Sequence, residues 1–400
     1  MTDAFHDSRS LNLPLRVWQT LRWPLAAFIG SRLLLFVTGA WAQSLLSERP
    51  GGWHAAPELP LLDMWARWDS GFYLDIATTG YSYLPGEQSS VAFFPLYPLL
   101  VKLFAWLTGP VAAGVLVSNL CFLLALVCLY ELTRLELSER AARRSVWLLS
   151  LFPASFFFSA VYTESLFLLL ALASFYAARS GRWGLASLAS LLAGATRVVG
   201  VLLVLPLGLL WLRAQGWTLA RVHKPAAWQS LAQGLRRDFG GLLCIVTVPL
   251  GLLSYMVFLA RQFAEPWAFA RVQAAWGREL SSPFIVLQND LSQFYRGLDV
   301  GELYWQVPLD LSALLLGLAL LPFIWRRLGA AYGVFVLSGL LLPLSSSTQS
   351  LLRYLTVLFP VFMLLGELVR RRWVVGAVYG VFGGGLSVLF ALFVNWYFVA

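Results

Sequence analysis

Apolar residues recur along the 400-residue chain in stretches that approach the length of a membrane-crossing helix, which is about 20 residues. Short polar segments, in which arginine is frequent, separate these stretches. Two outer segments, 47–109 and 261–306, are long and rich in tryptophan and tyrosine. We predict an all-α integral membrane protein with a long helical first outer loop and one domain over residues 1–400. The pattern predicts eleven transmembrane helices, at 22–46, 110–133, 146–161, 165–178, 183–196, 198–212, 239–260, 307–324, 329–345, 354–369 and 373–398.

Composition supports a membrane protein, and the position of the charges gives its orientation. Charged residues make up 12% of the chain, against about 25% in soluble domains. The net charge of +9 would suit a nucleic-acid partner if it were clustered on one soluble surface. With the N-terminus inside, however, the inner segments hold 19 of the 29 basic residues and 7 of the 20 acidic ones. This is the positive-inside pattern, so the excess charge indicates orientation and no nucleic-acid partner is expected.

Two pairs of predicted spans are too short to be ordinary. Residues 146–178 and 183–212 each have basic flanks and exceed one crossing, so each is predicted to fold as a hairpin with its apex towards the outer surface. Glu164 lies at the first apex and Arg197 midway along the second segment. An unpaired charge at membrane depth costs about 2.5–3.5 kcal/mol, which makes both residues functional candidates. The alternative is that they only pair with each other.

The first outer segment contains three aspartates within residues 62–76. If this segment is helical, at 100° per residue, Asp69 lies in the middle of an apolar and aromatic face, while Asp63 and Asp75 lie 120° away on either side. Burial on such a face without a partner raises the pKa of a carboxylate and is costly. Asp69 is therefore the unusual residue of the three and the candidate base. The alternatives are that the segment is not helical, or that Asp69 caps a helix over the following turn.

A serine-rich outer loop, 345–350, leads into a span whose first charged residue is Arg353. Arginine beside the backbone amides of a helix start suits a phosphate, and the alternative is an interfacial arginine that reaches for water. The second long outer segment adds Arg271, Gln273, Trp276 and Arg278. These four residues fit either an aromatic and basic platform or a surface helix.

Asp69, Glu164, Arg197 and Arg353 all fall on the outer side under this topology. No G-x-G-x-x-G motif or P-loop faces the inner side, so a nucleotide-linked donor is not expected. A lipid-linked phosphate is a good leaving group and needs no general acid. One carboxylate that deprotonates a hydroxyl, together with arginines that hold the departing phosphate, would suffice for a transfer from such a carrier.

Several motifs resemble those of the PIG-V-like mannosyltransferases. The first two are the more specific, and the others extend the likeness over most of the chain. The motifs are Arg67-Trp68-Asp69-Ser70 with Phe72-Tyr73, Ala92-Phe93-Phe94-Pro95-Leu96-Tyr97-Pro98, Phe152-Pro153, Tyr162-Thr163-Glu164-Ser165, Thr196-Arg197 with Gly200, and Arg353-Tyr354 with Phe359-Pro360.

The resemblance implies a multispanning GT-C-type helical bundle that transfers a hexose, most simply mannose, from a polyprenyl-phosphate carrier with inversion. The family's outer-loop aspartate corresponds to Asp69, which is expected to be the general base. The chain's length and its arginine-rich inner side are those of a prokaryotic member, which implies a plasma membrane and a site on the non-cytoplasmic side. We expect substrate binding by Arg67, Trp68, Tyr73, Tyr97, Glu164, Arg197, Arg353 and Tyr354.

The expected partners are membrane lipids, the polyprenyl-phosphate-sugar donor and a lipid-linked or other hydroxyl acceptor. No further cofactor is expected, and the sequence contains no Asp-x-Asp pair, which argues against the metal dependence of other GT-C branches. The competing class is a flippase or another transporter of a lipid-linked sugar. Transporters often consist of two repeated halves, and no halves match in this sequence.

Overall fold

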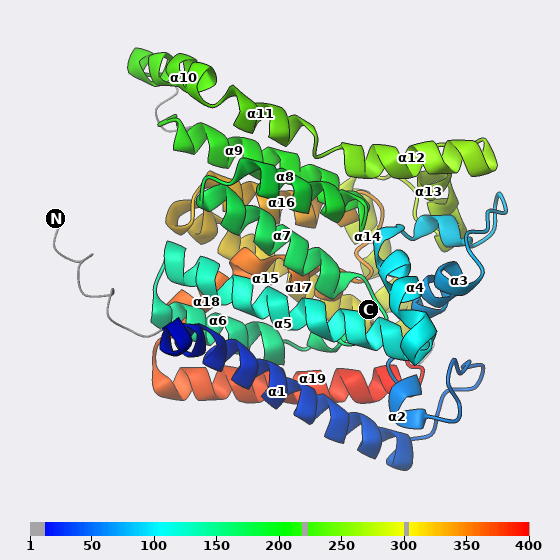
Figure 1. Cartoon of the computed structure of the whole chain (residues 1–400). Helices are drawn as coiled ribbons and strands as arrows, with labels where there is room; N and C mark the ends of the chain where they lie inside the picture. Colours follow the sequence, from blue (N-terminus) through cyan, green and yellow to red (C-terminus); the bar gives the residue numbers. More distant parts are fainter. Residues whose placement is uncertain (1–12, 218–222, 300–303, 400) are drawn as a thin grey trace.

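The computed structural model describes residues 13–217, 223–299 and 304–399, and these residues form an all-helical structure. Arg9 and Arg221, which the sequence assigns to the inner side, lie outside the described residues. The long helices run side by side as a bundle, and several short ones gather at one end of it (Figure 1). Helix α5 (Pro110–Glu136) packs against α1 (Leu13–Leu45), α4 (Leu96–Thr108), α6 (Glu139–Leu151) and α7 (Glu164–Arg179).

Among the residues that the structure describes, five segments are long and apolar enough to cross a membrane. They lie in α1, α5, the consecutive helices α11 (Phe239–Val246) and α12 (Leu250–Phe263), α15 (Gln306–Arg327) and α19 (Arg372–Val394). A sixth is formed if α17 (Leu351–Val357) and α18 (Phe359–Leu368), which meet at a bend of 77°, make one crossing. The other five predicted spans contain shorter helices, so the number eleven stays a prediction.

The two predicted hairpins are built from these shorter helices. The chain leaves α6, passes through η2 (Ser155–Phe158) and a turn, and returns as α7. It then runs through α8 (Trp183–Gly194), η3 (Val198–Leu203) and α9 (Val204–Ala214), beside which α16 (Ala330–Leu344) packs. A Cβ on Gly200 would lie 2.3 Å from the carbonyl of Ala193. Only glycine therefore lets η3 fold back against α8 at the turn that carries Arg197.

The outer segments supply the short helices at one end of the bundle. The first contains α2 (Pro60–Asp63), α3 (Ser70–Thr78), η1 (Ser90–Ala92) and α4, and the second contains α13 (Ala268–Arg271), η5 (Val272–Trp276) and α14 (Pro283–Asp299). In Figure 1 these helices lie at the right of the bundle, whereas α10 (Pro225–Arg237) lies at its far left.

The structure corrects the single helix that we assumed over residues 62–76. Helix α2 ends at Asp63 and α3 begins at Ser70, and Trp68 between them has a left-handed backbone with φ 52°. The ring of Trp68 packs edge-on against Trp396 and Phe398. This packing and a buried ion pair between Asp63 and Arg67 stabilise the break, so the assumed helical face does not exist.

Helix α7 connects two chemically different ends of the bundle. It begins at Glu164, among the short outer helices, and ends at Arg179, which pairs with Glu136 at the end of α5. Arg144 of α6 donates to the carbonyl oxygen of Gly366 in α18 at 2.6 Å. Sixteen helical residues span about 24 Å, so an arginine-rich end lies roughly one bilayer core away from Glu164.

Candidate active site

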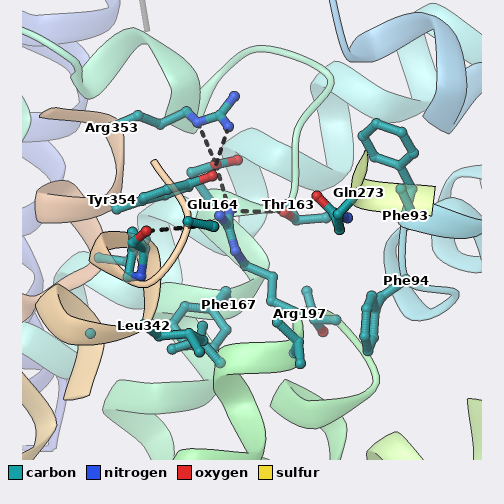
Figure 2. A pocket seen from close by; sticks show the side chains of 18 of the residues that line it. Phe93, Phe94, Thr163, Glu164, Phe167, Arg197, Gln273, Leu342, Arg353 and Tyr354 are labelled. Carbon is teal, nitrogen blue, oxygen red and sulfur yellow. Dashed lines mark hydrogen bonds and ion pairs between the residues drawn. The ribbon is translucent and has the colours of Figure 1, made fainter. Parts of the chain in front are cut away.

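A cavity of about 440 Å³ opens where the short outer helices meet the bundle. Its walls come from α3, η1 and η5 on one side and from α7, η3, α16 and α17 on the other. The volume lies within the range of small-molecule sites, and Figure 2 shows side chains from both walls. Five residues with charged side chains line it: Asp69, Glu164, Arg197, Arg278 and Arg353.

Glu164 is the buried centre of an ion-pair network. Its Oε1 lies 2.6 Å from Nη1 of Arg197 and 3.4 Å from Nε of Arg353, and its side chain is 1% exposed (Figure 2). Nη1 of Arg197 also donates to the hydroxyl of Thr163 at 3.2 Å. Glu164 and Arg197 thus pair as the alternative required, but they do not pair only with each other, since Glu164 also faces Arg353 and both residues line the cavity.

Asp69 is the more accessible of the two cavity carboxylates. It holds the N-cap position of α3 without a side-chain capping bond. Its Oδ2 lies 3.2 Å from Nη1 of Arg353, and its side chain is 34% exposed. Among the described residues, Arg353 is the one ion-pair or hydrogen-bond partner of this carboxylate. Asp69 can therefore receive a hydrogen bond or a proton from a molecule in the cavity, and it is far more accessible than Glu164, which is 1% exposed.

Arg353 projects from the first turn of α17, and a buried aspartate fixes that turn. Asp310 of α15, 3% exposed, accepts hydrogen bonds from the backbone N–H groups of Ser350 (3.1 Å) and Leu352 (2.8 Å). Ser350 has a left-handed backbone with φ 74°, which starts the helix abruptly. Arg353 is 5% exposed, so it is not an interfacial arginine that reaches for water.

Sequence reasoning missed Asp310. The available signal was a carboxylate within a predicted span, since such residues are functional candidates by default.

Two tyrosines complete the polar wall. The hydroxyl of Tyr73 lies 3.4 Å from that of Thr163, and Nη2 of Arg353 donates to the hydroxyl of Tyr354 at 3.5 Å. Burial, followed by the negative charge of Glu164, raises the pKa of Tyr73 far above its ordinary value. Tyr73 therefore stays neutral and can act in the cavity as a hydrogen-bond partner.

Three of the predicted site residues lie outside the cavity wall. Arg67 is 1% exposed and bonds to Asp63 (2.8 Å) and to the carbonyl of Val394 (3.0 Å). Trp68 packs against the C-terminal aromatic residues, as described above. The hydroxyl of Tyr97 lies 2.8 Å from that of Ser118 and is fully buried. These three side chains hold the elements around the cavity together.

The second outer segment contributes more than the sequence could decide. Gln273, Trp276 and Arg278 line the cavity, so the platform interpretation fits better than a detached surface helix. The ring of Trp276 lies 5.8 Å from that of Phe72 and 6.1 Å from that of Phe93. Within the described parts of the chain, no group of three or more His, Cys, Asp or Glu residues is placed to hold a metal ion.

Part of the chain that forms the cavity is similar in sequence to known proteins. Residues 56–207 match the family described as Mannosyltransferase (PIG-V). GPI mannosyltransferase pigv-1 of Caenorhabditis elegans is 32% identical over 128 residues, which are 27% of this chain and 18% of that protein. GPI mannosyltransferase 2 of Drosophila pseudoobscura pseudoobscura is 32% identical over 112 residues, 25% of this chain and 24% of that protein. The chain thus matches less than a quarter of the length of either relative.

A solved structure extends the likeness to most of the fold. ArnT from Cupriavidus metallidurans, crystallised with undecaprenyl phosphate, superposes with a TM-score of 0.50 at 14% identity, over 86% of this chain and 59% of that chain. The chain therefore shares its overall helical fold with ArnT, and several of its described helices are long and apolar enough to cross a membrane. Residues 56–207, which match the family described as Mannosyltransferase (PIG-V), contribute Asp69, Glu164 and Arg197 to the cavity.

Proposed function

We propose that the protein is an inverting glycosyltransferase of a single membrane-embedded domain, which moves a hexose, mannose in the first instance, from a polyprenyl-phosphate carrier to a hydroxyl acceptor such as a glycolipid. The observation that carries this proposal is one cavity that combines a partly exposed carboxylate, Asp69, with three arginines. The matched mannosyltransferase region and the ArnT fold support the sugar and the type of carrier.

The proposed reaction is one displacement at the anomeric carbon of the donor sugar. The acceptor oxygen forms the new bond to that carbon while the bond to the phosphate oxygen breaks, and the phosphate keeps the bonding electron pair. The acceptor proton passes to the free oxygen of Asp69. A positioned base of this kind contributes about 10²- to 10⁴-fold to the rate, and the lipid phosphate leaves as an anion without needing a proton.

Arg353 has two assignments to reconcile. The sequence suggested that it holds the donor phosphate, and in the structure its Nε and Nη1 face Glu164 and Asp69. We assign Arg353 first to the orientation of Asp69. Because the network ties that arginine to a buried carboxylate, Asp69 is held at one place on the cavity wall, which is the condition for efficient proton transfer.

The cavity is proposed to face the non-cytoplasmic side of a prokaryotic plasma membrane. Glu164 begins α7 at the cavity, and the arginine-rich ends of α6 and α7 lie at the opposite end of the bundle. Basic loops favour the cytoplasm. Reporters fused after Arg144, Arg237 and Arg372 should then report cytoplasm, and those near Glu87, Leu280 and Ser347 the outside. An outside signal at Arg237 would contradict the single-face site.

The donor class is tested with purified protein and an acceptor membrane extract. A polyprenyl-phosphate mannose should yield a glycosylated product that mass spectrometry detects, and a nucleotide-linked mannose alone should not. Equal or better use of the nucleotide sugar would overturn the donor assignment. Movement of labelled lipid across vesicles without any transferred sugar would favour the transporter class instead.

A further inference from the structure

We infer that Arg278, on the second outer segment, is the residue that binds the phosphate of the lipid carrier. This inference rests on the proposed function and names the cation at the same cavity. It begins with a charge imbalance, because three arginines and two carboxylates line the cavity. One positive charge is therefore in excess, and a polyprenyl-phosphate sugar is a phosphodiester with one negative charge.

The ion pairs identify which arginine carries the excess. Arg197 pairs with Glu164, and Arg353 pairs with both Glu164 and Asp69. Arg278 makes no ion pair with any residue in the described parts of the chain, and its Nε is buried without a hydrogen-bond partner there. A buried arginine nitrogen in a cavity wall without a counter-ion favours an anionic ligand, since guanidinium binds phosphate through two parallel hydrogen bonds.

The local fold holds Arg278 in place on both sides. Before it, Trp276 packs against Phe72 and Phe93 of the first outer segment. Gly277 has a left-handed backbone with φ 67°, and the N–H of Arg278 donates to the carbonyl of Gln273 at 3.1 Å. After it, the N–H of Ser281 donates to the carbonyl of Ser345 at 2.8 Å. These contacts tie the arginine between α3, which starts after Asp69, and the end of α16.

The charge stays balanced through the transfer. Before the reaction the cavity's excess positive charge faces the single negative charge of the donor. When the acceptor proton moves to Asp69, the cavity gains one positive charge, and the departing phosphate monoester gains one negative charge. Arg278 would therefore hold the product more tightly than the donor, and it stabilises the charge that develops on the leaving oxygen.

The test measures binding rather than transfer. Purified protein in nanodiscs is titrated with a polyprenyl phosphate and with the uncharged polyprenol of equal length, and the ratio of the two affinities isolates the phosphate contribution. Arg278→Gln should reduce that ratio roughly 10- to 150-fold, the range for losing a charge-assisted hydrogen bond. Arg278→Lys should recover part of it, because a point charge replaces the guanidinium fork.

Matched variants separate the possible outcomes. Arg271→Gln removes an equal charge from the same segment, at an exposed residue that pairs with Glu265 outside the cavity, and should leave the ratio unchanged. Asp69→Asn should keep or raise it, since a negative charge is removed. An affinity ratio for Arg278→Gln within about threefold of wild type, or an equal loss in Arg271→Gln, would overturn the role of Arg278. The proposed function would not be affected by that result. A wild-type protein that does not prefer the phosphate would instead remove the proposed donor.

Discussion

Two aspartates of the first outer segment, Asp63 and Asp69, each pair with an arginine, and the surroundings of the two pairs differ. In the pair Asp63–Arg67 the charged atoms are 2.8 Å apart and both side chains are at most 2% exposed. In the pair Asp69–Arg353 the distance is 3.2 Å and the carboxylate is 34% exposed. The same residue types thus produce a closed structural contact in one case and a cavity wall in the other.

The difference lies in how much bonding capacity each carboxylate has left. Asp63 accepts the backbone N–H of Ala56 at 2.8 Å and lies 2.7 Å from a ring nitrogen of His54, in addition to Arg67. Burial tends to raise the pKa of Asp63, but these hydrogen bonds outweigh it and hold the pKa below its ordinary value. Asp63 is therefore fixed as an ion inside the protein, whereas Asp69 keeps an oxygen for a substrate. The comparison teaches that accessibility, and not residue type, distinguishes the candidate base.

The largest effect is expected from replacing Arg67, which tests whether the Asp63–Arg67 pair is structural. Arg67→Gln leaves the buried carboxylate of Asp63 without its cation, and breaking such a pair costs about 3–5 kcal/mol. We expect a large fall in melting temperature and little monodisperse protein after extraction. Arg271→Gln, at an exposed pair, serves as the control. A folded and fully stable Arg67→Gln protein with reduced donor binding would instead make Arg67 a substrate residue, as the sequence suggested.

Removing Arg353 should affect the reaction more than the fold. Arg353→Gln loses the group that orients Asp69, and transfer should fall roughly 10- to 150-fold, the equivalent of one charge-assisted hydrogen bond. Arg353→Lys should restore part of the activity. The fall is expected mainly in kcat, with the phosphate preference in binding reduced less than in Arg278→Gln. An equal reduction of the phosphate preference in both variants would indicate that Arg353 also binds the donor phosphate.

A smaller effect is expected from Asp310, which positions Arg353 through the backbone of α17. Asp310→Asn keeps one acceptor but weakens the bonds to the N–H groups of Ser350 and Leu352. Transfer should fall about fivefold, which corresponds to about 1 kcal/mol. In the Arg353→Gln background the same substitution should add almost nothing. Independent losses that multiply would show that Asp310 supports the fold in general rather than Arg353.

The sequence predicted the helical membrane class and four of the five charged cavity residues that carry the account, and the reasons are physical. Hydropathy and loop charge vary along the chain itself, so helices and a common outer side for Asp69, Glu164, Arg197 and Arg353 can be inferred from them. Intramembrane charges such as Glu164 are costly and stand out for that reason.

The remaining parts depend on contacts between distant segments. The break between α2 and α3 at Trp68 is stabilised by Trp396 and Phe398, which lie more than 300 residues away in the sequence. The residues around Trp68 alone therefore do not predict it. The assumed helix selected Asp69 by a geometric argument that the structure contradicts, since residues 64–69 do not belong to a helix. Likewise, whether Arg278 lined a site or a free surface depended on where the second outer segment folds. The hydrogen bond from Arg67 to the carbonyl oxygen of Val394 likewise could not be predicted from neighbouring residues.

The most direct test of the account compares Asp69→Asn with Asp75→Asn in the same transfer assay. Asp75 is an exposed carboxylate of the same helix, α3, and its substitution should leave activity at the wild-type level. Asp69→Asn preserves shape but cannot accept the acceptor's proton, so transfer should fall by about 10²- to 10⁴-fold, with wild-type melting temperature and polyprenyl-phosphate binding retained. Activity of Asp69→Asn within about threefold of wild type in that folded, ligand-binding protein would contradict Asp69 as the base.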